Sequence, residues 1–259
     1  MTKIHFYKYQ AAGNDFVLVD NREAKLSFST SQITKLCDRR FGIGADGLIL
    51  LEKDPKLDFK MVYFNSDGSE GFCGNGCRAI MHLAHRLSIT GLTANFSAFD
   101  GQHSATILSE GIVKQSLIDV SIIEPRGEDL FINTGTEHNI RFVKNLATYP
   151  IVEEGRKIRY SDLYQPKGTN ADFVEVTLDG NVSFRIYERG VEDETFSSGS
   201  GATACALAVA KKYSQDSPIK LKTKGGILEV EFKISQDGTF HNIYLTGPVG
   251  LVFETTVEV

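Results

Sequence analysis

The sequence predicts a mixed α/β (α+β) protein of two pseudo-symmetric domains, each a curled, mostly antiparallel sheet around a central helix. Three observations predict this fold: an internal repeat, a glycine-rich turn followed by an apolar helix in each half, and strand-like runs on both sides of that helix. A chain of 259 residues that is 41% hydrophobic can bury one large core or two medium ones. The repeat favours two.

The repeat relates the two halves by an offset of 125 positions, which aligns Cys-Gly-Asn-Gly at 73–76 with Ser-Gly-Ser-Gly at 198–201. The same offset pairs 59–61 with 184–186, 100–101 with 225–226, and 118–121 with 243–246. Weaker echoes pair 13–16 with 135–138 and 45–46 with 171–172. Coincidence among glycine-rich turns is the alternative, but one offset that holds over about 60 residues favours duplication. We therefore expect an N-terminal domain over 1–123, a C-terminal domain over 124–250, and a terminal strand over 251–259 that returns to the N-terminal domain.

The elements follow the same order in each half. Strand-like runs such as Phe16–Val19 and Leu48–Leu51 come before the first glycine-rich turn. Between them, Thr30–Cys37 is typical of a capped amphipathic helix with Ile33, Leu36 and Cys37 on one face. A helix follows each turn, and strands follow the helix.

The two helices after the turns indicate where the cores lie. Residues 202–210 are small or apolar on nearly every side, which is typical of a helix buried all round. Residues 77–87 carry a broad apolar face with a few polar positions. We therefore expect each sheet to curl around its own helix.

Charge and composition exclude several function classes. The net charge is −5 with no basic run, so a phosphate backbone has little to bind and a nucleic-acid partner is disfavoured. No apolar run approaches the ~20 residues of a membrane span, and the N-terminus lacks a signal-peptide core. Four cysteines are too few for a disulfide scaffold. We expect a soluble, cytoplasmic protein with no membrane partner.

Both glycine-rich turns place unhindered backbone amides at the start of a buried helix. These amides have no partner inside the helix and carry partial positive charge, which suits a carboxylate, a phosphate or a developing oxyanion. Gly74, Gly76, Gly199 and Gly201 allow close approach of a ligand to the backbone. We expect the two turns to face one interdomain cleft that holds a small molecule.

Cys73 lies at the mouth of the first turn. The pKa of a thiol at a helix N-terminus is lowered, which makes Cys73 a candidate base or nucleophile. An ordinary packed cysteine is the alternative. Cys77 forms a Cys-x3-Cys pair with it, but no second pair of cysteine or histidine has metal-ligand spacing, so we expect no metal. Cys37 and Cys205 are expected in the core.

Polar residues beside the turns could hold a zwitterionic substrate. Arginine suits a bidentate contact with a carboxylate, and glutamate or asparagine suits an ammonium group. Taken singly, each is also explained as a turn former or a solvated surface residue. The candidates are Asn14, Asn65, Asn170, Glu188 and Arg189.

Motifs in a fixed order along the chain resemble diaminopimelate epimerase. They are Ala12–Phe16, Phe41–Gly47, Asn65–Glu70 with Cys73–Gly76, Tyr187–Gly190 and Leu245–Pro248. The resemblance implies two pseudo-symmetric domains without a cofactor, and epimerisation of LL- and meso-diaminopimelate in lysine and peptidoglycan precursor biosynthesis. It implies a small amino acid as partner, and a homodimer is one oligomeric state it allows.

The resemblance also implies roles for residues of this chain. In the family two cysteines face each other across the substrate α-carbon, and Cys73 matches one of them. Asn75 and Gly76 match the residues that bind the reacting carboxylate. The wider set of implied substrate contacts is Asn14, Asn65, Gly74, Asn75, Gly76, Thr136, Asn170, Glu188, Arg189, Gly199 and Ser200.

Three positions depart from the family pattern. Ser198 stands where the family has its second catalytic cysteine, Thr136-Glu137-His138 replaces Asn-Pro-His, and Glu70–Cys73 is one residue shorter than usual. A serine hydroxyl is a far weaker acid than a thiol. Ser198 therefore leaves three interpretations open: a replacement introduced to trap substrate, a natural relative with one-base chemistry such as dehydration of a hydroxyproline-like substrate or racemisation of another amino acid, or a catalytically silent binding homologue.

Overall fold

The computed structural model describes residues 3–258, which form two units. The first unit contains the residues up to Gln115 and those from Gly247 onward, and the second contains Ser116–Thr246. Among residues 3–258, no helix is both long and apolar enough to cross a membrane.

The sheet of the first unit begins with the last strand of the chain. Its main strands, in order of pairing, are β18 (Gly250–Glu258), β1 (Lys3–Ala11), β2 (Asn14–Asp20), β3 (Gly47–Glu52), β4 (Phe59–Asn65), β6 (Thr93–Ala98), β7 (Gly101–Ser109) and β8 (Ile112–Ser116). Short β5 (Glu70–Gly71) also pairs with β4. The pairs β2–β3 and β4–β6 are parallel, and the others in this series are antiparallel.

The second unit repeats this sheet strand by strand. Its series is β9 (Ile123–Arg126), β10 (Asp129–Asn133), β11 (Glu137–Phe142), β12 (Asn170–Val176), β13 (Val182–Glu188), β15 (Ile219–Thr223), β16 (Gly226–Ile234) and β17 (Phe240–Pro248). Short β14 (Asp193–Thr195) pairs with β13, and the parallel pairs β11–β12 and β13–β15 fall at the corresponding places. The structure thus confirms the predicted duplication, and β7 and β16 have the same bounds at the offset of 125.

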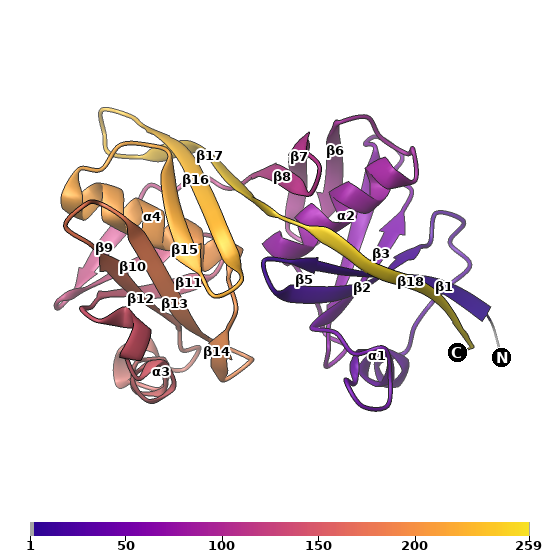
Figure 1. Cartoon of the computed structure of the whole chain (residues 1–259), viewed down its shortest axis with the longest axis horizontal. Coiled ribbons are helices and arrows are strands. Elements are labelled where there is room, and N and C mark those ends of the chain that lie inside the picture. The colour runs from indigo at the N-terminus through magenta and orange to yellow at the C-terminus, as the bar shows by residue number, and fades with distance from the viewer. Residues whose placement is uncertain (1–2, 259) are drawn as a thin grey trace. The chain divides into compact units, whose positions relative to one another are not determined.

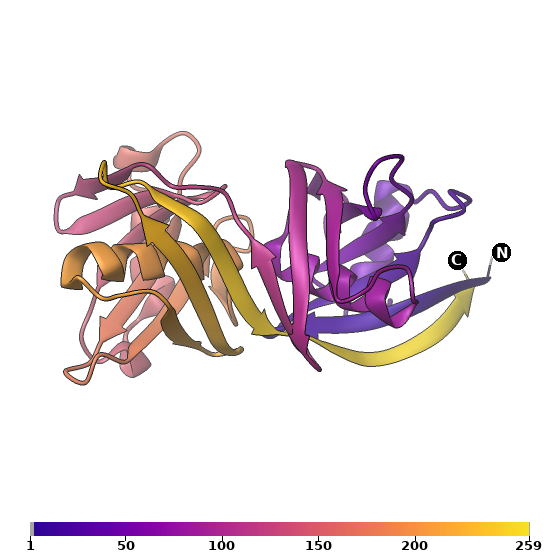
Figure 2. The same ribbon diagram turned by 90° about the horizontal axis from the view of Figure 1, so that it is seen from above.

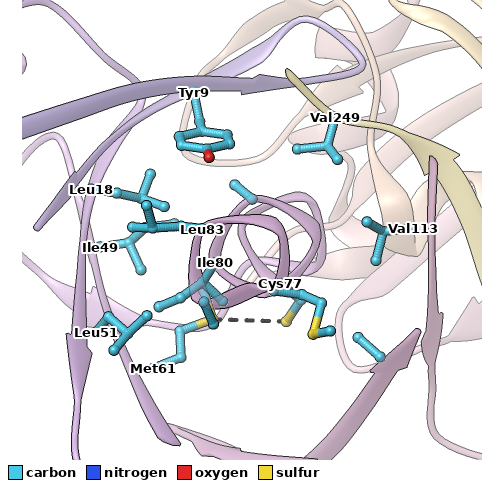
Figure 3. Close-up of a cluster of buried hydrophobic side chains, with 14 of the residues drawn as sticks. Tyr9, Leu18, Ile49, Leu51, Met61, Cys77, Ile80, Leu83, Val113 and Val249 are labelled. Atoms are coloured by element: carbon cyan, nitrogen blue, oxygen red, sulfur yellow. Dashed lines mark hydrogen bonds between the residues drawn. The ribbon is translucent and has the colours of Figure 1, made fainter. Parts of the chain in front are cut away.

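A helix fills the concave side of the first sheet. It is α2 (Gly74–Arg86), and apolar side chains surround it on all sides in Figure 3. Tyr9, Ile49 and Met61 contribute from strands, Ile80 and Leu83 from the helix itself. Burial of each such side chain contributes on the order of 1.5–3 kcal/mol to folding.

The corresponding helix of the second unit is α4 (Gly199–Tyr213). Every residue from Gly201 to Ala210 is buried, and most are alanine or another small residue. The small side chains let the surrounding strands approach the helix closely, and Figures 1 and 2 show it enclosed by them. The predicted central helix in each half is confirmed.

One shorter helix lies against the outer face of each sheet. In the first unit it is α1 (Thr30–Cys37), which buries Ile33, Leu36 and Cys37 as the sequence predicts, and a capping box at Ser29 and Gln32 starts it. In the second unit it is α3 (Ile151–Arg159), which packs on β12 and β13. Short 3-10 turns at Leu146–Thr148 and Asp162–Tyr164 flank α3.

The chain passes from one unit to the other at 115/116 and 246/247, and not at the expected boundaries 123/124 and 250/251. Residues after Gln115 already hydrogen-bond within the second unit, because Leu117 N donates to Ile243 O and Val120 pairs with Phe240. The chain returns to the first unit at Gly247, where β18 then pairs with β1 along eight positions.

Candidate active site: two helix N-termini

Cys73 is the N-cap residue of α2. Its backbone is extended (φ −139°, ψ 113°), and its side chain makes no capping hydrogen bond to the first turn of the helix. The half-buried thiol lies 3.5 Å from Oδ1 of Asn14, to which it donates. The first amides of α2 therefore lie next to the sulfur, where helix polarity favours negative charge.

Hydrogen bonds fix the two asparagine side chains beside Cys73. Asn14 Oδ1 accepts from Asn75 Nδ2 at 3.1 Å, and Asn14 Nδ2 donates to Asp46 Oδ2 at 2.5 Å. Asn75 Oδ1 accepts in turn from Arg78 Nη2 at 2.7 Å. The structure thus brings Cys73, Asn14 and Asn75 together.

Arg78 is a functional candidate that the sequence reasoning missed. Its side chain is completely buried, and burial lowers the pKa of its guanidinium to about 10. Within residues 3–258, its Nε and Nη1 and both polar atoms of buried Gln115 lack a hydrogen-bond partner. The only available signal was an arginine among the apolar residues of the helix after the turn.

An ion cluster supports Asn14 from the side opposite Cys73. Arg39 contacts both Asp15 and Asp46 at 2.7 Å, and Lys8 contacts Asp15 at 2.6 Å. Burial, and then the charge of Asp15, raises the pKa of Asp46. Burial would also raise the pKa of Asp15, but hydrogen bonds from Arg39 and Lys8 outweigh it and lower that pKa to about 2.

Of the remaining candidates in the first unit, Asn65 is exposed and Gly76 is buried. Asn65 is the exposed last residue of β4, before a turn; its Oδ1 accepts from Tyr63 Oη at 3.1 Å and its Nδ2 donates to Ser69 Oγ at 3.0 Å. These bonds hold Asn65 in its own turn and not in the Cys73 network. Gly76 is buried in the first turn of α2, and a Cβ there would lie 2.9 Å from Met61 Cε and 3.0 Å from Ile49 Cδ1, so these two side-chain ends would have to shift.

Ser198 occupies the N-cap of α4 with almost the backbone of Cys73 (φ −135°, ψ 128°). Its hydroxyl is buried and accepts from the Gly201 amide at 3.2 Å, so it caps the helix. Ser200 Oγ lies 3.2 Å from Ser198 Oγ. The two turns that the repeat aligned are therefore equivalent helix starts.

A chain of hydrogen bonds continues from Ser200 into the core of the second unit. Thr136 Oγ1 lies 3.1 Å from Ser200 Oγ and 2.9 Å from Nε2 of His138. His138 Nδ1 lies 2.7 Å from Asp172 Oδ2, and both of these side chains are fully buried. Sequence reasoning noted His138 only within a motif, and gave Asp172 no role beyond the repeat.

Asn170 and Arg189 form a separate group at the starts and ends of neighbouring strands. The Arg189 amide donates to Asn170 Oδ1 at 2.9 Å, and Asn170 Nδ2 donates to the carbonyl of Glu137 at 2.9 Å. The guanidinium of Arg189 pairs with Glu137 at 2.8 Å. Glu188 is the last residue of β13.

The other cysteines are buried and their thiols are hard to ionise. Burial raises the pKa of Cys37 to about 11, and raises the pKa values of Cys77 and Cys205 well above the ordinary value. Cys77 donates to Met61 Sδ at 3.8 Å in the core of Figure 3. Cys73 is the exception, because it alone of the four is not fully buried.

Comparisons with known proteins agree over nearly the whole chain. The model of the diaminopimelate epimerase family matches residues 6–114 and 130–252. The chain is 48% identical to the diaminopimelate epimerase of Flavobacterium psychrophilum over 97% of this chain and 99% of that one. It is 38% identical to the diaminopimelate epimerase of Aquifex aeolicus over 97% and 96%.

Solved structures with low sequence identity share the fold. A Bacillus anthracis phenazine biosynthesis protein of the PhzF family superimposes with a TM-score of 0.80 at 14% identity, covering 100% of both chains. A hydroxyproline epimerase from Agrobacterium vitis gives 0.72 at 11% identity, covering 98% of this chain and 92% of that one. At these identities the likeness shows the fold alone.

Proposed function

The chain belongs to the diaminopimelate epimerase family, and we propose that it interconverts LL- and meso-diaminopimelate at the α-carbon, as a cytoplasmic enzyme of lysine and peptidoglycan precursor biosynthesis. Cys73 and Ser198 are the proposed acid and base. One observation carries the proposal: the two residues hold the same N-cap position and backbone at the starts of α2 and α4.

The thiolate of Cys73 takes the α-proton in one direction of the reaction, and the thiol returns it in the other. Removing the proton leaves negative charge on the α-carbon and its carboxylate. The amides at the start of α2 and α4 are suited to that charge, because they gain most when the charge is largest. Gly74, Asn75 and Gly76 at one helix, with Gly199 and Ser200 at the other, are the proposed carboxylate contacts.

The remaining polar side chains are proposed to hold the rest of the zwitterion. Asn14 lies within hydrogen-bond distance of Cys73, which suits a group that orients the substrate at the reacting carbon. Asn65, Asn170, Glu188 and Arg189 are the proposed contacts for the other charged groups, on the strength of the motif matches. A side chain such as Arg189 would bind a carboxylate, and Glu188 an ammonium.

Ser198 favours a second candidate function. A relative that removes a proton with Cys73 alone would need no second thiol, and it would eliminate water from a hydroxylated amino acid or racemise another one. A silent homologue would bind an amino acid without exchange. The one-base relatives cleave the α-C–H bond and give different products, whereas the silent homologue gives no exchange, so α-proton exchange and product analysis together separate the alternatives.

The test is incorporation of solvent deuterium at the α-carbon of LL- and meso-diaminopimelate, followed by NMR together with conversion between the isomers. The proposal expects both exchange and conversion in the wild type, and loss of both in Cys73→Ala. Cys37→Ala is the matched control, since it removes a thiol from the core behind α1 and should leave exchange unchanged. Exchange that survives in Cys73→Ala removes Cys73 from the mechanism, and tight calorimetric binding without exchange supports the silent homologue.

A further inference from the structure

We propose that a hydrogen-bonded relay of Ser200, Thr136 and His138, with Asp172 behind it, carries protons to and from Ser198. This inference rests on the proposed function. It gives the path by which the Ser198 hydroxyl, a weaker acid than a thiol, receives and loses its proton. The path has four contacts of 3.2, 3.1, 2.9 and 2.7 Å, from Ser198 Oγ to Asp172 Oδ2. Every contact is within hydrogen-bond distance.

Each member of the path can pass a proton on. A hydroxyl both donates and accepts, and an imidazole binds a proton at one nitrogen while the other holds a fixed partner. Asp172 accepts from Nδ1 of His138, so Nε2 is the nitrogen that faces Thr136. The arrangement is that of a carboxylate that orients a histidine and stabilises its imidazolium form.

The proton balance closes in both directions. When Ser198 gives its proton to the α-carbon, it takes one from Ser200, which takes one from Thr136. Thr136 takes the Nε2 proton of His138, so one N–H bond breaks as one C–H bond forms. In the opposite direction the α-proton goes to Ser198 and the same shifts leave His138 as imidazolium beside Asp172. Each hydroxyl is restored and nothing is oxidised or reduced.

The burial of His138 and Asp172 suits them to hold the proton at the inner end of the relay. His138 and Asp172 are 0% exposed, so water does not compete for the proton at that end. Asp172 Oδ1 has no hydrogen-bond partner among residues 3–258, although an unpaired buried carboxylate oxygen is costly. The charge of an imidazolium compensates that cost. At the other end of the relay, the Gly201 amide donates to Ser198 Oγ. This cap occupies an acceptor site of the hydroxyl and leaves its proton for the substrate.

The first unit shows what the relay adds. The equivalent contacts there run through Asn75 and Asn14 to Asp46, and an amide NH2 group holds a partner without passing a proton on. Cys73 needs no relay, because a thiol ionises near neutral pH by itself. The groups that can pass a proton on, the hydroxyls of Ser200 and Thr136 and the imidazole of His138, thus lie in the unit where Ser198 replaces the thiol.

The experiment replaces Thr136 by valine, which exchanges its hydroxyl for a methyl group of similar size. Thr134→Val is the matched control, because Thr134 Oγ1 donates to the carbonyl of Ser200 at 3.0 Å and, within the described part of the chain, to no side chain of the relay. In Thr136→Val we expect kcat for epimerisation to fall about 100-fold, the scale of general acid–base catalysis, with KM changed little. Deuterium exchange with retention, in the isomer whose α-proton faces Cys73, should persist within a few-fold.

A second comparison separates the relay from simple substrate binding. In a Ser198→Cys background the thiol ionises without help, so Thr136→Val should then cost less than about tenfold. An equal loss in both backgrounds, or equal effects of Thr136→Val and Thr134→Val, overturns the relay. Loss of exchange together with epimerisation in Thr136→Val also overturns it. A wild-type chain that exchanges no α-proton overturns the proposed function as well, whereas an active wild type with an unaffected Thr136→Val overturns the relay alone.

Discussion

Asn14 and Thr136 hold equivalent places in the two repeats. Asn14 is the first residue of β2 and Thr136 immediately precedes β11. Each contacts the second residue of the central helix of its unit at 3.1 Å: Asn14 contacts Asn75, and Thr136 contacts Ser200. Behind each lies a carboxylate, reached directly as Asp46 in the first unit and through His138 in the second. Duplication therefore kept the positions of the polar side chains and changed their chemistry.

Arg78→Met is expected to separate activity from stability. No carboxylate of residues 3–258 contacts the buried guanidinium, so a methionine of similar length should leave the melting temperature unchanged or raise it. In this variant Asn75 loses the donor that fixes its Oδ1. We expect the rate of α-proton exchange to fall about tenfold, which corresponds to the free energy of one hydrogen bond to a charged group. Thermal unfolding and deuterium exchange check the two parts. A strongly destabilised variant would contradict this reading of Arg78.

Ser198→Cys is expected to raise the rate of isomer conversion by at least ~10-fold, since a thiol is a much stronger acid than a hydroxyl. The serine also caps α4 through the Gly201 amide, so the same change should lower stability by about 0.5–2 kcal/mol. Conversion rates and denaturant unfolding measure both effects. If the rate does not rise, the site has diverged to another reaction, and loss of water from a hydroxyproline-like substrate is the next assay.

Gly201→Ala is expected to destabilise the second unit by about 1–3 kcal/mol, the scale of overpacking in a core. A Cβ at this position would lie 2.6 Å from Asp172 Oδ1 and 3.1 Å from Ile186 Cδ1. Gly91→Ala is the control, because a Cβ at Gly91 meets nothing within 4 Å. The melting temperatures of the two variants check the difference. Equal melting temperatures would mean that Asp172 moves aside without cost.

Asp15→Asn is expected to destabilise the chain near pH 7 and progressively less in acid. The pKa of Asp15 is lowered to about 2 in the folded chain, against about 3.9 unfolded, so its ion pairs stabilise the fold above pH 4. That stabilisation is lost as pH falls through about 2. Unfolding midpoints of wild type and variant should therefore converge between pH 4 and pH 2, while exposed Asp216→Asn serves as the control. A constant difference across this range would exclude the ion pairs as its cause.

Much of the fold was predictable because its signals are local. The periodic burial of Ile33, Leu36 and Cys37 and the cap before them define α1 within nine residues of sequence. The apolar run after Ser198 similarly predicts a helix buried all round. The repeat adds the equivalence of Cys73 and Ser198, since a shared offset needs no knowledge of distant contacts.

The unit boundaries depended on longer-range pairing. Residues 116–122 carry no strong local signal, and their place follows from hydrogen bonds to β17, more than a hundred positions later. A composition shift that could mark the boundary at Gln115 is absent from the sequence. The expected boundary at 123 followed the repeat, whereas the observed one follows backbone pairing.

The sequence by itself determined the duplication, the two central helices, and the equivalence of Cys73 and Ser198 at their starts. Only the tertiary structure decided which polar groups stand behind them: Arg78 behind Asn75, and His138 with Asp172 behind Ser198. The physical reason is that hydrophobic burial repeats every few residues along an element and is therefore visible in the sequence. Hydrogen bonds that join residues 64 and 34 positions apart, as at Thr136 with Ser200 and His138 with Asp172, leave no such period. They exist only once the strands and helix ends have been brought together.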